Sequence, residues 1–155
     1  MEFIIARAKA QPAGAPLVLL PIGKLTNIAL AQAIDPAFAT LTKGIVLMGS
    51  SLNPATDDPE FATSPRHEFN FWFDPEAARI VLRAPWPRVD VTTVDVSIKA
   101  MFTKEMFDAI SRSSTPAARY ITQYATERYY LWDELAACAW LDPAIITKTR
   151  ALYMD

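Results

Sequence analysis

The sequence predicts an α/β fold in which helices flank a partial, open and mostly parallel β-sheet. Short, continuously apolar segments alternate with segments whose apolar residues recur at helical spacing, and prolines and glycines separate the two kinds. A short run without polar residues is typical of a strand buried in a parallel sheet. Alternating strands and helices favour a layered α/β architecture, which we expect residues 1–155 to form as a single partial domain.

Three strands are predicted, over residues 17–20, 44–49 and 89–94. The first two are apolar runs, and the third is rich in β-branched residues. A sheet of this width is narrower than mid-sized α/β domains usually have. The last segment, residues 145–155, shows no closing element either, so the sequence predicts a fragment of a larger domain.

Helical spacing predicts six helices, and they continue into the carboxyl-side half of the chain. They cover residues 3–10, 25–34, 75–83, 103–110, 116–129 and 133–141. Asp74 and Pro75 form the N-cap and first-turn proline pattern that opens a helix, and Asp133 occupies an equivalent capping position. Residues 50–67 are polar and contain several prolines, so we predict a loop there. Asp57 and Asp58 within it are expected to be solvated.

The composition argues against several classes of partner. The 15 basic and 17 acidic residues give a net charge of -2, so no excess of positive charge exists to neutralise phosphates, and no nucleic-acid partner is expected. No apolar run reaches the ~20 residues that a membrane span needs, and the acidic start is unlike a signal peptide. Cys138 is the single cysteine and is expected to be a small buried residue. These features favour a cytoplasmic protein.

Candidate binding residues lie where the predicted strands end, because ligands of open α/β sheets collect at the carboxyl ends of strands. Residues 21–27 and 48–51 occupy these positions. Near the last helix, Trp132 precedes Asp133. A carboxylate beside an indole can bind a cation and stack a base, whereas helix capping is the simpler role for this aspartate.

A further candidate lies in residues 68–73. If this segment is extended, Glu68, Asn70 and Trp72 share one side of it. A carboxylate and an amide side by side can accept from and donate to sugar hydroxyls. The alternative is a surface acid beside a turn asparagine.

Taken in order, these short motifs resemble the inosine–uridine-type nucleoside hydrolase family. The resemblance rests on residues 23–29, 45–49, 68–70, 74–78 and 132–133, and it covers roughly residues 3–143. It implies a Rossmann-like core and an enzyme that hydrolyses the N-glycosidic bond of ribonucleosides, releasing ribose and a free base. It also implies a calcium ion that binds the ribose hydroxyls and the attacking water, and homo-oligomers, which the family often forms.

The resemblance also implies roles for individual residues. Asp133 and the backbone carbonyl of Ile22 would be calcium ligands. Met48 would pack under the sugar, and Asn53 would offer it a further amide. The complete set of substrate-binding residues implied in this way is Met48, Glu68, Asn70, Trp132 and Asn53, with Glu68 and Asn70 on the ribose hydroxyls.

Trp132 departs from the pattern of many family members, which have a histidine at this position to protonate the leaving base. An indole N–H is not acidic enough for that role. Purine-preferring members also have tryptophan here and stack the base on it, so Trp132, with Tyr129 and Tyr130 just upstream, predicts a preference for purine nucleosides. His67, the only histidine, is either a substitute acid or a surface residue.

The family has a cluster of aspartates after its first strand, which binds calcium and supplies the catalytic base. This sequence has no counterpart of that cluster. Calcium takes ~6–8 oxygen ligands, so the implied site is incomplete and the catalytic residues are unknown. The resemblance therefore implies part of a purine-leaning nucleoside N-ribohydrolase that is inactive alone. A non-catalytic nucleoside- or ribose-binding module is the alternative.

Overall fold

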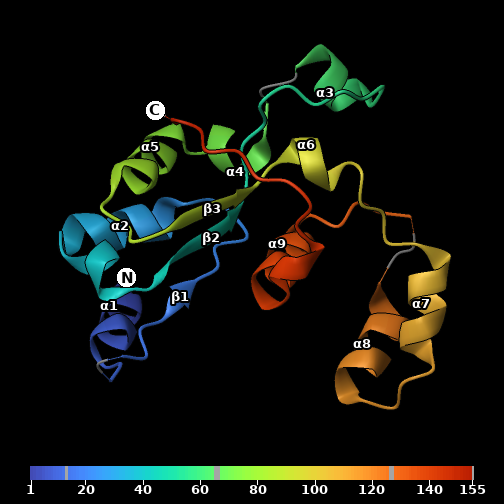
Figure 1. Ribbon diagram of the computed structural model, residues 1–155, viewed down its shortest axis with the longest axis horizontal. Helices are drawn as coiled ribbons and strands as arrows, with labels where there is room; N and C mark the ends of the chain where they lie inside the picture. Colours follow the sequence, from blue (N-terminus) through green and yellow to red (C-terminus); the bar gives the residue numbers. More distant parts are fainter. Residues whose placement is uncertain (13, 65–66, 126–127, 155) are drawn as a thin grey trace.

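The computed structural model contains a central parallel β-sheet with helices packed around it (Figure 1). It describes residues 1–12, 14–64, 67–125 and 128–154. The strands are β1 (Val18–Leu19), β2 (Gly44–Met48) and β3 (Val89–Thr92), in the spatial order β1–β2–β3. Val18 lies opposite Gly44, and Ile45 lies opposite Val89, in parallel register. The predicted α/β class and parallel sheet are confirmed.

Helices make up most of the remaining regular structure. The α-helices are α1 (Glu2–Lys9), α2 (Thr26–Ile34), α3 (Pro59–Thr63), α4 (Phe69–Trp72), α5 (Pro75–Arg83), α6 (Val94–Ser97), α7 (Lys104–Ser111), α8 (Pro116–Tyr124) and α9 (Asp133–Leu141), and the short 3-10 helices are η1 (Phe38–Leu41) and η2 (Pro143–Ile145). None of the helices in the described part of the chain is long and apolar enough to cross a membrane.

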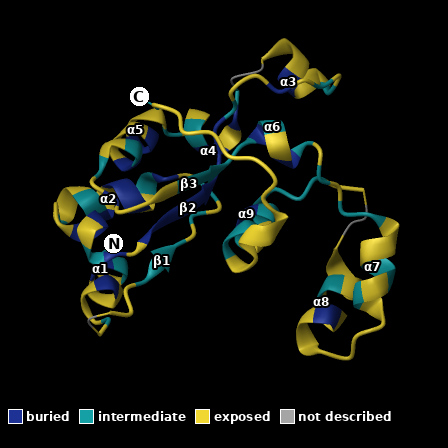
Figure 2. Ribbon diagram, viewed as in Figure 1, coloured by how far each residue is buried: buried dark blue, intermediate teal, exposed yellow. Residues whose placement is uncertain are grey.

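Strand β2 lies at the centre of the core, and every one of its residues is buried (Figure 2). Ile45 and Leu47 belong to one apolar cluster together with buried residues of α2 and α5. Met48 belongs to a second cluster, which includes Ala136 of α9. Both faces of β2 are therefore covered, which explains why this strand contains no polar side chain.

Gly44 is required by the close approach of two backbone segments at the start of β2. Its φ angle is +151°, in the region that L side chains rarely adopt. A Cβ atom at this position would lie 2.7 Å from the carbonyl oxygen of Arg88, which precedes β3. Any larger residue would therefore push β2 and β3 apart at the point where their pairing begins.

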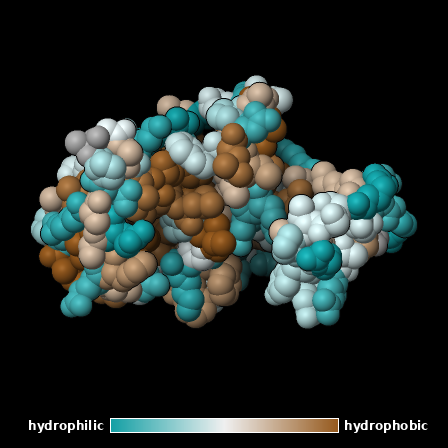
Figure 3. Space-filling model, turned by 90° about the horizontal axis from the view of Figure 1, so that it is seen from below, coloured by the Kyte–Doolittle hydropathy of each residue, from teal (hydrophilic) through white to brown (hydrophobic). Residues whose placement is uncertain are grey.

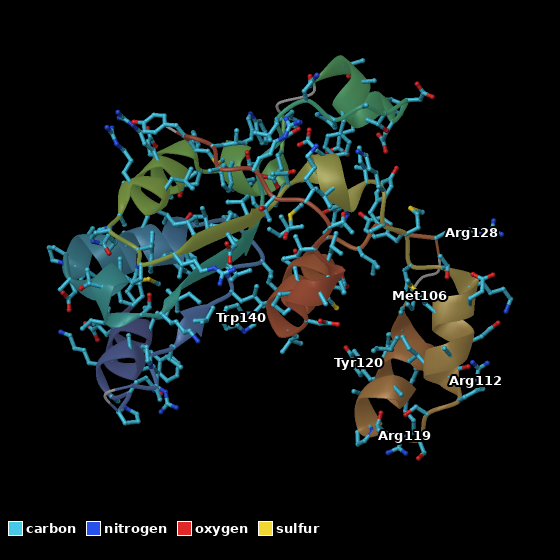
Figure 4. The ribbon with its side chains drawn as sticks, viewed as in Figure 1. Met106, Arg112, Arg119, Tyr120, Arg128 and Trp140 are labelled. Atoms are coloured by element: carbon cyan, nitrogen blue, oxygen red, sulfur yellow. The ribbon has the colours of Figure 1, made fainter. Side chains whose placement is uncertain are left out.

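Helices α7 and α8 form a hairpin that projects away from the sheet (Figure 1). The two segments that connect it to the body pair with each other in antiparallel fashion: the backbone N–H of Phe102 donates to the carbonyl of Tyr129 (2.7 Å), and that of Leu131 donates to the carbonyl of Ala100 (2.8 Å). Arg112 and Arg119 lie at the end of the hairpin farthest from the sheet (Figure 4). The second of these segments leads directly into Trp132, so the base of the hairpin is also the entry to α9.

Helix α9 is held close to the start of β2. Its Trp140 side chain points toward the sheet (Figure 4). The Lys43 ammonium, just before β2, lies 5.7 Å from the centre of a ring of Trp140. On the face seen in Figure 3, apolar side chains gather over the central part of the molecule, whereas the end with the hairpin is mostly polar or neutral. The exposed apolar side chains on this face therefore lie over the central part of the molecule and not on the hairpin.

Several expectations about local structure are wrong. The predicted loop of residues 50–67 contains helix α3, and residues 68–73 are not extended because α4 occupies them. Helix α8 ends at Tyr124, short of the predicted residue 129. Cys138, expected to be buried, is exposed on α9. Apolar spacing identified the longer helices, but it did not register the short helices α3 and α4 or the point where α8 ends.

Candidate functional site

A pocket of about 510 Å³ opens where the three strands end. Its walls come from the segments that follow the strands, from α3 and α4, and from the start of α9. Most of the site residues expected from the sequence line it: Ile22, Met48, Glu68, Asn70, Trp132 and Asp133. Segments far apart in the sequence thus meet at the carboxyl edge of the sheet, where ligands of open α/β sheets bind.

Glu68 is a buried N-cap whose carboxylate organises the wall of the pocket. Its Oε1 accepts a hydrogen bond from the backbone N–H of Asn70 (2.9 Å), and its Oε2 accepts from those of Ser50 (2.9 Å) and Phe71 (3.0 Å). A carboxylate offers about four acceptor sites, so these bonds leave roughly one for a ligand hydroxyl. Ser50 has a φ of +68°, and the bond to Glu68 holds this left-handed turn at the end of β2.

Asn70 is buried beside Glu68, and its amide Nδ2 donates to the backbone carbonyl of Met48 at 3.2 Å. This bond fixes the amide over the end of β2 and uses one of its two N–H donors. Glu68 and Asn70 therefore reach the same pocket through a helical turn, and not through the strand alternation that the sequence predicted. Trp72, which alternation would place on the same side, is instead 57% exposed.

Trp132 and Asp133 enter the pocket from the start of α9. Trp132 is the N-cap of α9 and Asp133 its first helical residue, so the expectation that Asp133 caps the helix is wrong. Asp133 is half-buried, and this burial, followed by the negative charges of Glu134 and Glu68, raises the pKa of its carboxyl group. A group in this environment gains from a nearby positive charge, because such a charge offsets both burial and repulsion.

The loop from β1 to α2, which contains Ile22, is fixed by two contacts with the start of α5. The Lys24 ammonium lies 3.6 Å from the centre of the Phe73 ring. The Thr26 hydroxyl donates to the carboxylate of Asp74, which also accepts from the backbone N–H of Ala77 as the N-cap of α5. The predicted capping role of Asp74 is confirmed, and these bonds, with that of Thr26 first, hold the pKa of its carboxyl group below the usual value.

The described residues do not complete a calcium site. No group of three His, Cys, Asp or Glu side chains in this part of the chain lies close enough together to hold a metal ion. The Asp133 carboxylate and the Ile22 carbonyl are oxygen donors of the kind calcium prefers, and both residues line the pocket. Two donors fall short of the ~6–8 that the ion takes, so the residues present do not fit calcium by themselves.

Two candidate residues lie outside the pocket. Asn53 is exposed and does not line it, and its backbone N–H donates to the Asp95 carboxylate at 2.8 Å. His67 lies against Trp72, with ring centres 4.3 Å apart, and does not line the pocket either. The structure thus places His67 where it packs on an exposed aromatic ring and not where it would reach a leaving base.

Sequence reasoning missed three further lining residues, namely Glu60, Phe61 and Val94. Phe61 lies in α3, within the segment predicted to be a loop. The sequence contained a usable signal, because Asp58 and Pro59 repeat the aspartate–proline pattern that opens α5. Asp58 is not simply solvated as expected, since its Oδ1 accepts from the N–H of Glu60 at 3.0 Å and caps α3.

Comparison with known proteins places the chain among nucleoside hydrolases. The family model described as inosine-uridine preferring nucleoside hydrolase matches residues 1–155. The inosine-uridine preferring nucleoside hydrolase of Crithidia fasciculata is 34% identical over 146 residues, which are 86% of this chain and 44% of that protein. The pyrimidine-specific ribonucleoside hydrolase RihB of Escherichia coli is 33% identical over 101 residues, 65% of this chain and 30% of that protein.

A solved structure shows the same fold. The purine-preferring ribonucleoside hydrolase from Gardnerella vaginalis superposes with a TM-score of 0.73 at 27% identity, over 94% of this chain and 48% of that chain. The chain therefore spans less than half the length of these relatives.

Proposed function

Because this chain belongs to the inosine-uridine preferring nucleoside hydrolase family, we propose that its pocket is part of an enzyme that hydrolyses the N-glycosidic bond of ribonucleosides, releasing ribose and a free base. The observation that supports this most is the meeting of Glu68, Asn70, Trp132 and Asp133 in one pocket. These side chains join acceptors and donors for sugar hydroxyls to an aromatic surface for a base.

Each side chain has a distinct part in this proposal. Asn70 and the remaining acceptor site of Glu68 hydrogen-bond to the ribose hydroxyls and orient the sugar. Met48, buried at the end of β2, packs against the apolar face of the ribose. Trp132 stacks on the base at the start of α9. Asn53 would add a further amide to the sugar, but this requires its exposed segment to move closer to the pocket.

We propose a preference for purine nucleosides, and Trp132 supports it. An indole offers a wide flat surface to a bicyclic base but no proton at neutral pH. A base bound this way is held by stacking and must take its proton from another source. The named relatives include both a pyrimidine-specific and a purine-preferring enzyme, so the residues of this pocket, and not family membership, support the preference.

Calcium belongs to the proposal as the ion of the complete enzyme. This chain would contribute the Asp133 carboxylate and the Ile22 carbonyl, and the remaining donors and the catalytic base would come from outside the described residues. We therefore propose that the 155-residue chain binds nucleosides but does not hydrolyse them.

The alternative is a non-catalytic nucleoside- or ribose-binding module. Titration calorimetry of the purified chain with inosine and with ribose tests binding, and chromatography of inosine incubated with the chain and calcium chloride tests hydrolysis. Saturable binding without turnover is expected of this chain under both proposals, which differ in whether hydrolysis appears when a longer form of the protein supplies the missing aspartates. Turnover by the chain alone would contradict the missing base, and the absence of any binding would contradict the proposed pocket.

We further propose a cytoplasmic protein that acts on small nucleosides, without nucleic-acid or membrane partners, and that forms homo-oligomers when complete. The near balance of charge and the single exposed cysteine, Cys138, support the location and the choice of partner. Size-exclusion chromatography with light scattering tests the oligomeric state.

A further inference from the structure

Helix α3 is tied to the segment before α9 by one polar contact. The Tyr130 hydroxyl donates to Oδ2 of Asp58 at 3.2 Å, across 72 residues of sequence. Burial, followed by the hydrogen bond to Asp58 and the charge of that carboxylate, raises the pKa of Tyr130. Since Oδ1 of Asp58 caps α3, one carboxylate both begins this helix and anchors it.

Helix α3 also presents one apolar side chain to the pocket. Phe61 is 5% exposed and packs in the cluster that contains Met48, Val94 and Ala136. Its ring centre lies 6.1 Å from that of Trp132 at an interplanar angle of 54°. Phe61 therefore forms a fixed wall against one side of the indole.

Tyr130 contacts the same indole. Its ring centre lies 5.1 Å from that of Trp132, and the two planes meet at 64°. Trp132 itself is only half-buried. It directly follows the segment that forms the base of the α7–α8 hairpin. Without Phe61 and Tyr130, a half-exposed side chain at a helix start would be free to sample several rotamers.

We infer that Phe61, together with the Asp58–Tyr130 hydrogen bond, positions the indole of Trp132 and thereby sets the preference of the pocket for bicyclic over monocyclic bases. The inference rests on the proposed nucleoside-binding function. An indole already held in one orientation loses less conformational freedom when a base stacks on it, so binding is tighter. Positioning of the indole therefore raises the affinity for the base. It does not change the affinity for the sugar, which in this proposal is bound by Glu68 and Asn70 at the end of β2.

Two variants separate positioning from simple packing. Tyr130→Phe retains the ring but removes the hydroxyl that bonds to Asp58, and Phe61→Leu retains an apolar side chain but removes the aromatic wall. Asp58→Asn is the conservative variant: its amide oxygen can accept from the N–H of Glu60, and its amide N–H can donate to the Tyr130 hydroxyl, so both contacts can persist. Tyr124→Phe on α8 is the matched control, since Tyr124 is 62% exposed and packs on Tyr120 outside the pocket.

Fluorine NMR of the 155-residue chain labelled with fluorotryptophan reports the surroundings of the indole and its exchange between rotamers. The four tryptophans give separate signals, and that of Trp132 is assigned by its loss in Trp132→Phe. We expect Tyr130→Phe and Phe61→Leu to shift or broaden this signal and leave that of the core residue Trp86 unchanged. Asp58→Asn and Tyr124→Phe should leave both signals in place.

Calorimetry then measures affinity with inosine, uridine and ribose as probes. In the two positioning variants, inosine should bind roughly three- to ten-fold more weakly, as expected when a side chain that is no longer ordered must be immobilised on binding. Uridine should lose less affinity than inosine, because a single ring covers less of the indole, and ribose should be unaffected. An unchanged Trp132 signal, or an equal loss of affinity for inosine and ribose, would overturn the inference. If the unaltered chain binds none of these probes, the proposed function fails, and the Trp132 signal in Tyr130→Phe alone decides whether the indole is positioned as inferred.

Discussion

The carboxylate of Glu68 accepts a hydrogen bond from the backbone N–H of Ser50 at 2.9 Å and so connects α4 to the turn after β2. The same carboxylate accepts from the N–H groups of Asn70 and Phe71. A residue that resembles a ribose-binding acid is thus also a structural acceptor. Substitutions of Glu68 should affect folding and binding together.

We predict that Glu68→Ala destabilises the protein strongly. Three backbone N–H groups, two of them in the buried residues Ser50 and Asn70, would lose their acceptor. Each buried donor left unpaired costs about 1–3 kcal/mol. Urea denaturation should show a decrease of at least about 2 kcal/mol in the free energy of unfolding, with a smaller decrease for Glu68→Gln, which keeps one acceptor oxygen. Wild-type stability in Glu68→Ala would show that water or other groups replace the carboxylate.

A second prediction concerns acid stability and Asp95. Its carboxylate accepts from the backbone N–H groups of Leu52 (2.9 Å) and Asn53 (2.8 Å) and so ties the segment after β2 to α6. Burial raises the pKa of Asp95, but these hydrogen bonds, together with those from its own backbone N–H and the Thr93 side chain, lower it by more, and the net pKa lies below the usual value. A carboxyl group whose folded pKa is lowered contributes stability that is fully present above the unfolded pKa, ~3.9, and is lost as pH falls through the folded pKa.

The free energy of unfolding should therefore decline more steeply in the wild type than in Asp95→Asn as pH falls below ~4. Between neutral pH and ~5 the difference between the two proteins should be constant. Chemical denaturation at a series of pH values measures both slopes. Asp57→Asn, at an exposed residue of the same segment, is the control. Parallel curves for the wild type and Asp95→Asn would show that these hydrogen bonds do not survive in solution.

The fold class was predictable from the sequence because β2 has an unambiguous pattern. An apolar run between two glycines, followed by the aspartate–proline start of α5, leaves few alternatives to a buried strand and a helix. Short elements gave no such signal. Helix α4 consists of four residues, and the hydrogen bonds of Glu68 to groups on both sides of it determine its position.

Several residues that line the pocket were predictable from the sequence, but the geometry that brings them together was not. Glu68, Asn70, Trp132 and Asp133 were identified, and they do line one pocket. Phe61 escaped notice because its contact with Trp132 depends on the folding of a polar segment over the pocket. Contacts between residues so far apart in the sequence are set by tertiary packing, which periodicity along the chain does not encode.

A third prediction concerns calcium. The chain alone should bind the ion weakly, because Asp133 and the Ile22 carbonyl supply two donors where ~6–8 are needed. Calorimetry with calcium chloride should show no saturation at low concentration, and Asp133→Asn should change the titration little. A dissociation constant in the sensor range, ~10⁻⁷–10⁻⁵ M, would show that a full set of ligands exists within the chain.

The last prediction separates the base from the sugar. Trp132→Ala removes the indole that lines the pocket and lies against Phe61 and Tyr130. Stacking of a base on an aromatic side chain contributes ~1–3 kcal/mol, so inosine should bind roughly 5- to 150-fold more weakly, whereas the affinity for ribose should not change. Trp72→Ala is the matched control, since Trp72 is 57% exposed and does not line the pocket. If both ligands lost affinity in parallel in Trp132→Ala, the indole would be shaping the pocket as a whole and not stacking on the base.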